Sequence, residues 1–400
     1  MDKAQRLVLL STTLDMFLEG VFITLPSISA LLSSVPAWAE PLLFLTIPVG
    51  TLVGNLLIGR LTDVRGRKSA YIMMLLVYAV GAALIVTATG LYQLLAGLLI
   101  TQTAMGGEVP IVLSYIVESS PAESKERLVV IVTNVGNIGA LAVSWLAMST
   151  GGLSATAGRY AIAALIGGAL TIMVITRTLV PESRPWLSLS PSERGRVDLS
   201  FPGAKLWTAI LTLMAISSVL TFGLLALYIG PAEFKNMTYQ ILVVYFAGEA
   251  AGGAAAAAMV GRLGSRSTTL ISFAGGLATT LAAAAVLGLG AAPFLALLFI
   301  NGAFTEMVWA SRNVLESLTF PTTFRATAIS LVRVVPYLLM IASFYLTSSM
   351  NQVQYLAYAA AMWGLGVVGS VLWSLKGVEV VGRPLVMRPE ELARRGKVSE

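Results

Sequence analysis

Acidic residues inside long apolar stretches are the groups of this sequence whose type and spacing could do chemistry. Asp15 and Glu19 lie four residues apart in the first apolar stretch of the chain. On a helix this spacing places both carboxylates on one face, one turn apart. An ionised side chain at bilayer depth costs at least about 2.5–3.5 kcal/mol, and two acids that repel each other in low dielectric favour binding a proton. We therefore predict that Asp15 and Glu19 hold a coupling proton; the alternative is that both hydrate a water-filled cavity.

Three further charged side chains lie deep in apolar stretches of the second half of the chain. Glu249 and Glu306 are predicted to bind a solute, with pairing to a basic residue as the alternative. Arg333 could neutralise one of these acids or clamp a carboxylate of the solute. Arg312 and Glu316 are spaced for a structural ion pair on one helix face.

Uncharged polar side chains in the apolar stretches could complete a solute site, or could serve packing and interfacial anchoring. The candidates are Gln102, Asn134, Asn137, Asn301, Trp145, Trp309, Tyr228 and Tyr245. The predicted solute-binding set is Gln102, Asn134, Asn137, Tyr245, Glu249, Asn301, Glu306 and Arg333.

The sequence contains neither Cys nor His. Disulfides, thiolate chemistry and imidazole–metal sites are therefore not expected, and a proton carrier inside the chain would be a carboxylate. The sequence has no nucleophile constellation, no metal-binding acid cluster and no G-x-x-x-x-G-K phosphate loop. We expect a protein that is not an enzyme and that has no cofactor and no metal.

The elements that must position these residues are membrane-spanning helices. The chain has 400 residues, of which 56% are hydrophobic and 12% charged, against about 25% charged in soluble domains. A helical crossing needs about 20 apolar residues. We predict twelve crossings, at 7–32, 41–61, 69–89, 91–117, 128–149, 159–180, 204–230, 237–260, 267–290, 292–318, 326–348 and 353–376. Dividing the longer stretches differently gives eleven.

The distribution of Lys and Arg predicts the orientation in the membrane. With the N-terminus in the cytoplasm, the outer loops hold only Arg159 and Lys235, and Arg312 and Arg333 lie within helices. The remaining basic residues, Arg177 among them, fall in segments assigned to the cytoplasm. This asymmetry predicts cytoplasmic N- and C-termini and an even number of crossings. It also explains the net charge of +6, so nucleic acid is not an expected partner.

The polar segment 181–203 divides the sequence. We predict two six-helix bundles, 1–180 and 204–376, a cytoplasmic linker at 181–203 and a cytoplasmic tail at 377–400. An internal repeat supports this division, because Gly-Arg-Leu at 59–61 recurs at 261–263. The first apolar stretch is broken by acids and lacks a small-residue cleavage site, so it is not a convincing signal peptide.

The loop at 59–68, Gly-Arg-Leu-Thr-Asp-Val-Arg-Gly-Arg-Lys, resembles the signature loop between helices 2 and 3 of the major facilitator superfamily. Val64 stands where that family usually has a basic residue. The resemblance implies a twelve-helix secondary transporter in which Asp63 meets the start of helix 11, near 321–325. The implied cytoplasmic gate comprises Gly59, Asp63, Arg65, Gly66, Arg67, Lys68, Glu118, Arg127 and Glu182.

Three further motifs resemble those of sugar porters and organic-acid:proton symporters. They are Gly-Gly-Glu-Val-Pro at 106–110 followed by Glu-Ser-Ser-Pro at 118–121, Pro-Glu-Ser-Arg-Pro-Trp-Leu at 181–187, and Pro-Thr with Arg-Ala-Thr at 321–327. Glu108 in the first motif is expected to make structural hydrogen bonds. Those relatives usually carry an Arg where this chain has Leu98, so a proton switch that depends on this Arg cannot be carried over. Drug:proton antiporters typically have Gly-Pro in helix 5, and the stretch 134–139 has no Pro.

These resemblances imply a monomer in the plasma membrane, in contact with the lipid bilayer. It would move a small organic solute, such as a sugar or an organic or aromatic acid, by alternating access in symport with protons. The alternatives are proton-driven efflux of amphipathic compounds, uncoupled facilitation, or a sensor that uses the same fold without transport.

Overall fold

The computed structural model describes residues 2–32, 35–150 and 155–396, and its regular secondary structure in these ranges is helical. Within the described ranges, eleven helices are long and apolar enough to cross a membrane. They are α1 (Lys3–Thr24), α2 (Glu40–Arg65), α3 (Arg67–Val86), α4 (Leu91–Ser119), α5 (Lys125–Thr150), α6 (Ala155–Leu179), α8 (Ala204–Thr221), α10 (Thr238–Val286), α11 (Ala291–Thr319), α12 (Arg325–Thr347) and α13 (Gln352–Lys376). Shorter helical segments are η1 (Leu25–Leu31), η2 (Ala37–Ala39), α7 (Arg184–Leu187), η3 (Leu224–Ile229), α9 (Gly230–Glu233), η4 (Leu287–Leu289) and α14 (Pro389–Gly396).

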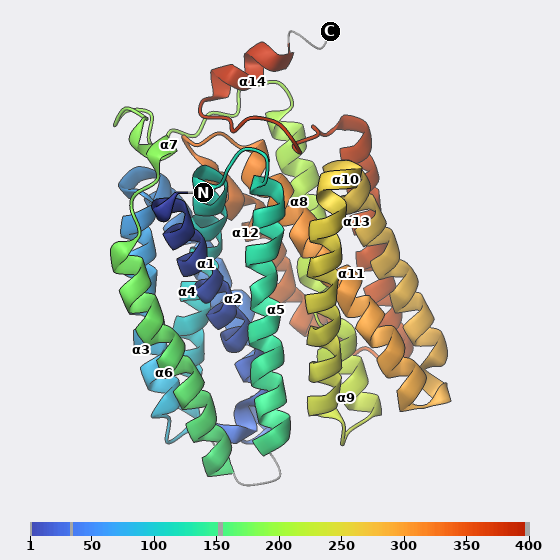
Figure 1. Ribbon diagram of the computed structural model, residues 1–400. Coiled ribbons are helices and arrows are strands. Elements are labelled where there is room, and N and C mark those ends of the chain that lie inside the picture. The colour runs from blue at the N-terminus through green and yellow to red at the C-terminus, as the bar shows by residue number, and fades with distance from the viewer. Residues whose placement is uncertain (1, 33–34, 151–154, 397–400) are drawn as a thin grey trace.

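The helices form two groups that face each other. Helices α1 to α6 lie together on one side and α8 to α13 on the other, with both chain ends toward the same end of the molecule (Figure 1). Across the boundary, α5 packs against α10 and α2 packs against α12. The residues between the two groups are therefore carried by helices from both halves of the sequence.

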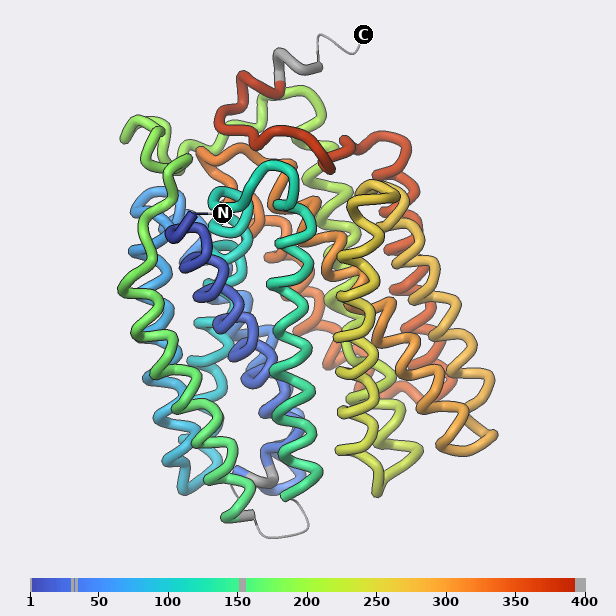
Figure 2. The backbone as a smooth tube through the Cα atoms, viewed as in Figure 1, coloured from blue at the N-terminus to red at the C-terminus, as the bar shows by residue number. Residues whose placement is uncertain are grey.

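The longest helix, α10, contains a break. Gly264 in its interior has φ 76° and ψ 170°, and glycine tolerates this backbone conformation because it has no Cβ. Figure 2 shows the chain reversing direction near this residue, so the two parts of α10 run antiparallel. The sequence predicted separate helices at 237–260 and 267–290, and the break lies between those ranges.

Two other predicted helices are shorter than expected. The stretch 7–32 is α-helical only to Thr24, because Pro26 removes a backbone donor and the chain continues as the 3₁₀ segment η1. The stretch 204–230 is α-helical only to Thr221, and Gly223 follows in the left-handed region with φ 66°. Phe222 lies at this second interruption, between α8 and the π-helical η3.

An acidic cap stabilises the turn between α2 and α3. Gly66, with φ 99°, separates the two helices. The Glu182 carboxylate accepts hydrogen bonds from the amides of Arg67 (3.0 Å) and Lys68 (3.1 Å), the first residues of α3. A carboxylate at this position satisfies unpaired amides and complements the positive end of the helix dipole.

The same arrangement recurs at the break in α10. The Glu379 carboxylate accepts hydrogen bonds from the amides of Ser265 (2.9 Å) and Arg266 (3.3 Å), directly after Gly264. Burial raises the pKa of Glu379, but the hydrogen bonds from the Ser265 hydroxyl and these amides outweigh burial and hold its pKa below the usual value. A glycine turn and a carboxylate cap thus occur in each half of the chain, although the turn glycine lies five residues after Gly-Arg-Leu in the first half and directly after it in the second.

The chain after α13 crosses the end of the molecule at which both termini lie. The carbonyls of Val386 and Met387 accept hydrogen bonds from the amides of Thr322 (3.0 Å) and Thr323 (3.3 Å), in the turn before α12. Arg388 pairs with Glu193 of the 181–203 segment, and its hydrogen bond lowers the pKa of the half-buried Glu193 carboxyl to about 2. The Gly382 amide donates to the Glu126 side chain of α5 at 2.9 Å, so the tail contacts both groups of helices. Residues 397–400 of the predicted 377–400 tail lie outside the described residues.

Candidate solute cavity and gate

A cavity lies between the two groups of helices. About 810 Å³ of space, open solvent included, separates its lining side chains. Its polar lining includes Glu19 from α1, Asn137 from α5, Glu306 and Asn313 from α11, and Arg333 from α12. Its apolar lining includes the rings of Phe222, Phe246, Trp309 and Tyr337. A mainly apolar pocket with a few convergent polar groups is the usual form of a small-molecule site.

Four of the predicted solute-binding or coupling residues thus line one cavity: Glu19, Asn137, Glu306 and Arg333. The sequence analysis did not single out Asn313, Phe222, Phe246 or Tyr337. Phe222 reaches the cavity because α8 ends just before it, and the apolar sequence around it gave no sign of that interruption.

Two arginines and one glutamate of α11 and α12 form a charged cluster beside the cavity. Arg333 donates from Nε to the Glu316 carboxylate at 2.9 Å and from Nη2 to the Asn313 side chain at 2.7 Å. Arg312 lies 3.1 Å from the other Glu316 oxygen and 4.2 Å from the ring centroid of Trp309. The predicted Arg312–Glu316 pair is confirmed, and two guanidinium groups share one carboxylate. Arg333 also lines the cavity, where its guanidinium could bind an anionic group.

Asp15 does not line the cavity. It is fully buried, and its Oδ1 accepts hydrogen bonds from Nε (3.1 Å) and Nη2 (2.6 Å) of Arg177 on α6. The same guanidinium contacts Glu108 on α4 and donates to the carbonyl of Tyr71 at 2.6 Å. Although Asp15 and Glu19 are one turn apart, Asp15 faces this ion cluster and Glu19 faces the cavity.

Arg177, which the sequence analysis counted among the charges of cytoplasmic segments, lies within α6 and is buried. Its side chain has no exposed surface and lies among helices α1, α3 and α4. Arg177 is two residues from the end of α6, which is why it resembled a flanking charge in the sequence. One sequence signal for this contact was available. Leu98 stands where the resembling transporters usually carry an Arg, so Asp15 needed a basic partner from another position.

The other predicted solute-binding residues make contacts outside the cavity lining. The Gln102 amide donates to the Phe22 carbonyl (3.0 Å), which joins α4 to α1. The Asn301 amide donates to the hydroxyls of Thr279 and Thr280, both at 3.0 Å. Asn134 donates to the Ala250 carbonyl (3.0 Å), the Tyr245 hydroxyl accepts from the Gly223 amide (3.2 Å), and Glu249 is 1% exposed.

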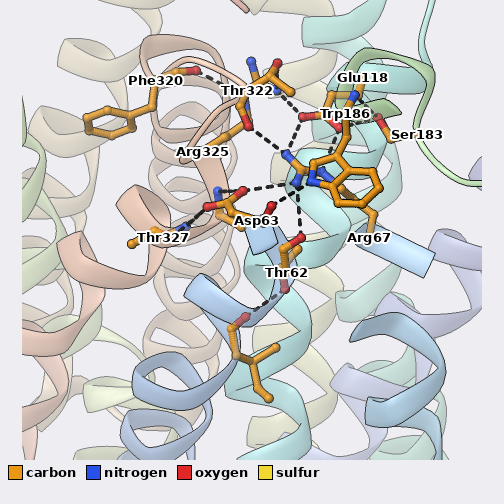
Figure 3. Close-up of polar contacts among 12 residues, drawn as sticks. Thr62, Asp63, Arg67, Glu118, Ser183, Trp186, Phe320, Thr322, Arg325 and Thr327 are labelled. Atoms are coloured by element: carbon orange, nitrogen blue, oxygen red, sulfur yellow. Dashed lines mark hydrogen bonds and ion pairs between the residues drawn. The ribbon is translucent and has the colours of Figure 1, made fainter. Parts of the chain in front are cut away.

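Asp63 connects the two groups of helices at the end where the termini lie (Figure 3). Its Oδ2 accepts hydrogen bonds from the amide (2.7 Å) and hydroxyl (2.8 Å) of Thr327, and its Oδ1 accepts from the amide of Ala326 (3.3 Å). These amides belong to the first turn of α12, where a carboxylate is favoured by the helix dipole. The sequence predicted that Asp63 meets the start of this helix, and the structure has this contact.

Two arginines converge beside Asp63, one from each half of the chain. Arg67 lies 3.2 Å from Asp63 and donates from Nε (2.9 Å) and Nη2 (2.8 Å) to Glu118. Arg325, the first residue of α12, pairs with the same Glu118 carboxylate. All four side chains are buried, so this network closes one end of the boundary between the groups.

The structure adds three residues to the predicted gate and moves three others away from its centre. Three residues of the network were not predicted as gate residues. They are Arg325, Ser183, whose hydroxyl donates to Glu118 at 2.6 Å, and Trp186, whose ring donates to the Asp63 carbonyl at 2.7 Å. Arg65 and Arg127 are exposed, and the Lys68 ammonium donates to the Thr178 carbonyl at 3.2 Å.

Two of the predicted gate residues are glycines that allow close approach. A Cβ on Gly59 would lie 2.1 Å from the Ser330 hydroxyl of α12, and one on Gly66 would lie 2.3 Å from the Glu182 carboxylate. Gly59 thus lets α2 and α12 touch beside Asp63, and Gly66 lets Glu182 cap α3.

The fold, the cavity and the gate define a multi-pass membrane protein with a small-molecule site between two helical groups. The sequence model of the Major Facilitator Superfamily matches residues 7–344. The chain belongs to this family, whose members are membrane transporters rather than enzymes.

Curated relatives match part of the chain. The niacin transporter NiaP of Acinetobacter baylyi is 32% identical over 155 residues, which are 38% of this chain and 33% of that protein. The minor myo-inositol transporter IolF of Bacillus subtilis is 29% identical over 150 residues, which are 38% of this chain and 34% of that protein. The chain thus matches about a third of the length of these relatives.

Solved structures share the fold over nearly the whole chain. The proton:xylose symporter XylE aligns with a TM-score of 0.76 at 17% identity and covers 98% of both chains. The transporter FucP in its outward conformation aligns with a TM-score of 0.64 at 16% identity, over 92% of this chain and 99% of that one. At these identities the likeness establishes the fold alone.

Proposed function

We propose that this protein is a secondary transporter that moves a small organic acid across the plasma membrane by alternating access. One observation carries the proposal: the cavity between the two groups is lined by the Arg333 guanidinium together with the aromatic residues Trp309 and Phe222. A guanidinium binds a carboxylate in bidentate geometry, and the rings suit a flat or apolar body. A relative that transports niacin supports this class of solute.

A polyhydroxylated solute is the second candidate. The same cavity offers acceptors and donors for hydroxyl groups, supplied by Glu19, Asn137, Glu306 and Asn313. The myo-inositol and xylose transporters among the similar proteins support this reading.

For the topology, we propose twelve crossings with both termini in the cytoplasm. The break at Gly264 divides α10 into two antiparallel segments, each long enough to span, and the bias of Lys and Arg sets the orientation. The segments 1–180 and 204–376 would move as two bundles, joined by 181–203 and the tail 377–400, in a monomer. The cytoplasmic side of the boundary between the bundles would be closed by Asp63, Arg67, Glu118 and Arg325.

For the energy source, we propose symport with protons, using Asp15 and Glu19. Glu19 faces the cavity, so a proton can reach it with the solute. Arg177 faces two acids, Asp15 and Glu108, and one oxygen of each lacks a hydrogen-bond partner. One bound proton would balance the charge of this cluster.

The decisive experiment compares solutes on the purified full-length protein. Nicotinate, nicotinamide, myo-inositol and xylose are tested by calorimetry, followed by counterflow in proteoliposomes with and without a pH gradient. Binding of nicotinate but not of the isosteric neutral amide supports an acid transporter. Binding of the polyols alone supports the second candidate, and equal uptake with and without the gradient contradicts proton coupling.

A further inference from the structure

We propose that Glu249 on α10 and Glu306 on α11 form a second proton-binding site, distinct from Asp15 and Glu19, with the proton held on Glu249. The site goes beyond the proposed function, and only its use in transport rests on that function. Glu306 lines the cavity, whereas Glu249 does not. Glu306 is thus placed to exchange a proton with the cavity, and Glu249 to store it.

The surroundings of Glu249 argue that its side chain is uncharged. It is 1% exposed, and neither carboxylate oxygen has a hydrogen bond of good geometry within the described part of the chain. In the same part, no Lys or Arg forms an ion pair with Glu249. Burial without a cation or a set of donors strongly disfavours the ionised form, whereas a carboxylic acid can remain there.

The charged and titratable groups that act on the pair do not supply the missing cation. Glu306 acts on Glu249, and Glu19 on α1 acts on Glu306, both as acids. Tyr245, one turn from Glu249, presents a neutral hydroxyl that also interacts with Thr305. Arg333 lines the cavity with Glu19 and Glu306 but pairs with Glu316, so a proton on one acid of the pair reduces the repulsion between Glu249 and Glu306.

The close packing of α10 and α11 brings the pair together. A Cβ on Gly252 would lie 2.0 Å from the Ala303 carbonyl, and one on Gly302 would lie 3.3 Å from the Glu249 amide. Gly302 is one helical turn before Glu306. The two acids thus project from neighbouring turns of helices whose backbones touch.

Two asparagines link this pair to the boundary between the bundles. Asn137 on α5 lines the cavity together with Glu306 and donates to the Asn134 side chain at 3.0 Å. Asn134 in turn donates to the carbonyl of Ala250, the residue after Glu249, at 3.0 Å. An ionised Glu306 holds Asn137 more strongly than a neutral one. Proton transfer within the pair therefore changes the contact between α5 and α10, across which the bundles must move.

Infrared difference spectroscopy on the purified full-length protein tests the proposal without any solute. Spectra at neutral and alkaline pH distinguish the carbonyl stretch of a carboxylic acid from a carboxylate. We expect an acid band at neutral pH in the wild type, with one component that is lost in Glu249→Gln and shifted in Glu306→Gln; any component from the Asp15–Glu108 cluster should remain in both variants. Glu123→Gln, which removes an exposed acid between α4 and α5, is the matched control and should keep the whole band.

Three results would overturn the proposal. The first is a wild type without an acid band at neutral pH, and the second is an unchanged band in Glu249→Gln. The third is stabilisation by Na⁺ that Glu249→Gln abolishes, since it would make the pair a metal-cation site.

Glu249→Gln mimics the neutral acid in shape, so its melting temperature at neutral pH should stay within a few degrees of the wild type. If it unfolds instead, Glu249→Asp replaces it, with a shifted band expected and an unchanged band contradicting the proposal. Because no solute is used, these outcomes stand even if transport is not proton-coupled.

Discussion

At the scale of single residues, the position of a charge within its helix decides its surroundings. Asp15 and Glu19 share a helix face by spacing, yet one contacts Arg177 and the other faces the cavity. Asp15 belongs to a buried ion cluster, whereas Glu19 is accessible to solute and protons from the cavity. Their amide variants therefore test two different parts of a coupling mechanism.

We expect Asp15→Asn and Glu19→Gln to lose accumulation driven by a pH gradient while keeping exchange of solute down its gradient. Each amide retains shape and hydrogen bonding but removes the proton that the acid binds. The measurement is gradient-driven uptake beside counterflow in the same proteoliposomes. If both variants still concentrate the solute, Asp15 and Glu19 do not carry the proton.

Arg333 is expected to distinguish anionic from neutral solutes. Hydrogen bonds to charged groups contribute about 1.5–3 kcal/mol, so Arg333→Leu should weaken binding of an anion about 10- to 100-fold. Arg333→Lys should recover part of the loss, because lysine keeps the charge but not the bidentate geometry. Binding of a neutral sugar should change little in either variant. Calorimetry that finds the anion bound equally by wild type and Arg333→Leu removes Arg333 from the site.

The sequence predicted contacts that depend on local chain geometry better than contacts that depend on how helices are rotated. Asp63 lies in a turn whose glycine and flanking charges are adjacent in sequence, and its contact with α12 was predicted. The partner of Asp15 comes from α6, and no local pattern indicates which face of α6 points inward. Likewise Gln102 and Asn301 are polar residues at depth, but helix rotation directs both into packing contacts rather than into the cavity.

At the scale of elements, a glycine turn followed by a carboxylate cap marks the start of one helix in each half of the chain. In each half of the chain a glycine with positive φ is followed by a helix whose first amides bind a carboxylate from a distant segment. The predicted helix ranges place a chain break near each of these glycines, and the sequence repeat at 59–61 and 261–263 was used to predict the division into two halves. The sequence did not predict Glu182 and Glu379 as caps, because both lie more than a hundred residues from the amides that they accept from. The interruption at Gly223 was also missed, since apolar residues continue on both sides of it.

The cap at the break in α10 should make stability depend on pH. The pKa of Glu379 is below its usual value of about 4.3, so its contribution is complete above that value and is lost as the pH falls through the folded-state pKa. We expect Glu379→Gln to lower the unfolding free energy by about 1 kcal/mol at neutral pH, as loss of a helix cap typically does. The deficit should shrink as the pH falls below the usual pKa of a glutamate.

Thermal unfolding in detergent across this pH range measures the effect, with Glu390→Gln in the exposed part of the tail as the control. A deficit in Glu379→Gln that is constant with pH would contradict the assignment of the cap to the ionised carboxylate. An equal loss in Glu390→Gln would show that any lost tail charge destabilises the protein.

At the scale of the whole molecule, the cavity and the gate are two parts of one boundary. The cavity lies between the bundles, and the Asp63 network joins them at the end where the chain termini lie. Arg67 and Arg325, from opposite halves, bind the same Glu118 carboxylate, so separation of the bundles at this end must break the Arg325–Glu118 contact. The network is buried, and breaking such a contact leaves charges without partners, which is costly.

Weakening the gate should therefore shift the protein toward the state open at this end. Asp63→Asn keeps a hydrogen-bond acceptor at the start of α12 but removes the charge that favours the helix dipole and Arg67. We expect transport to fall about tenfold while solute binding survives, since the cavity residues are unchanged. The chain has no cysteine, so a single Ser330→Cys substitution reports opening directly. Ser330 is 3% exposed and packs against Gly59 inside the closed gate.

Labelling of Ser330→Cys by a water-soluble maleimide should be several-fold faster in the Asp63→Asn background than alone. The matched control is Arg127→Gln, which removes a charge that is exposed at the same end; it should leave the labelling rate unchanged. Transport by Asp63→Asn at the wild-type rate, or labelling that does not change, would show that Asp63 does not hold the bundles together. Faster labelling with Arg127→Gln as well would mean that net charge at this end, rather than the Asp63 contact with α12, sets the equilibrium between the two states.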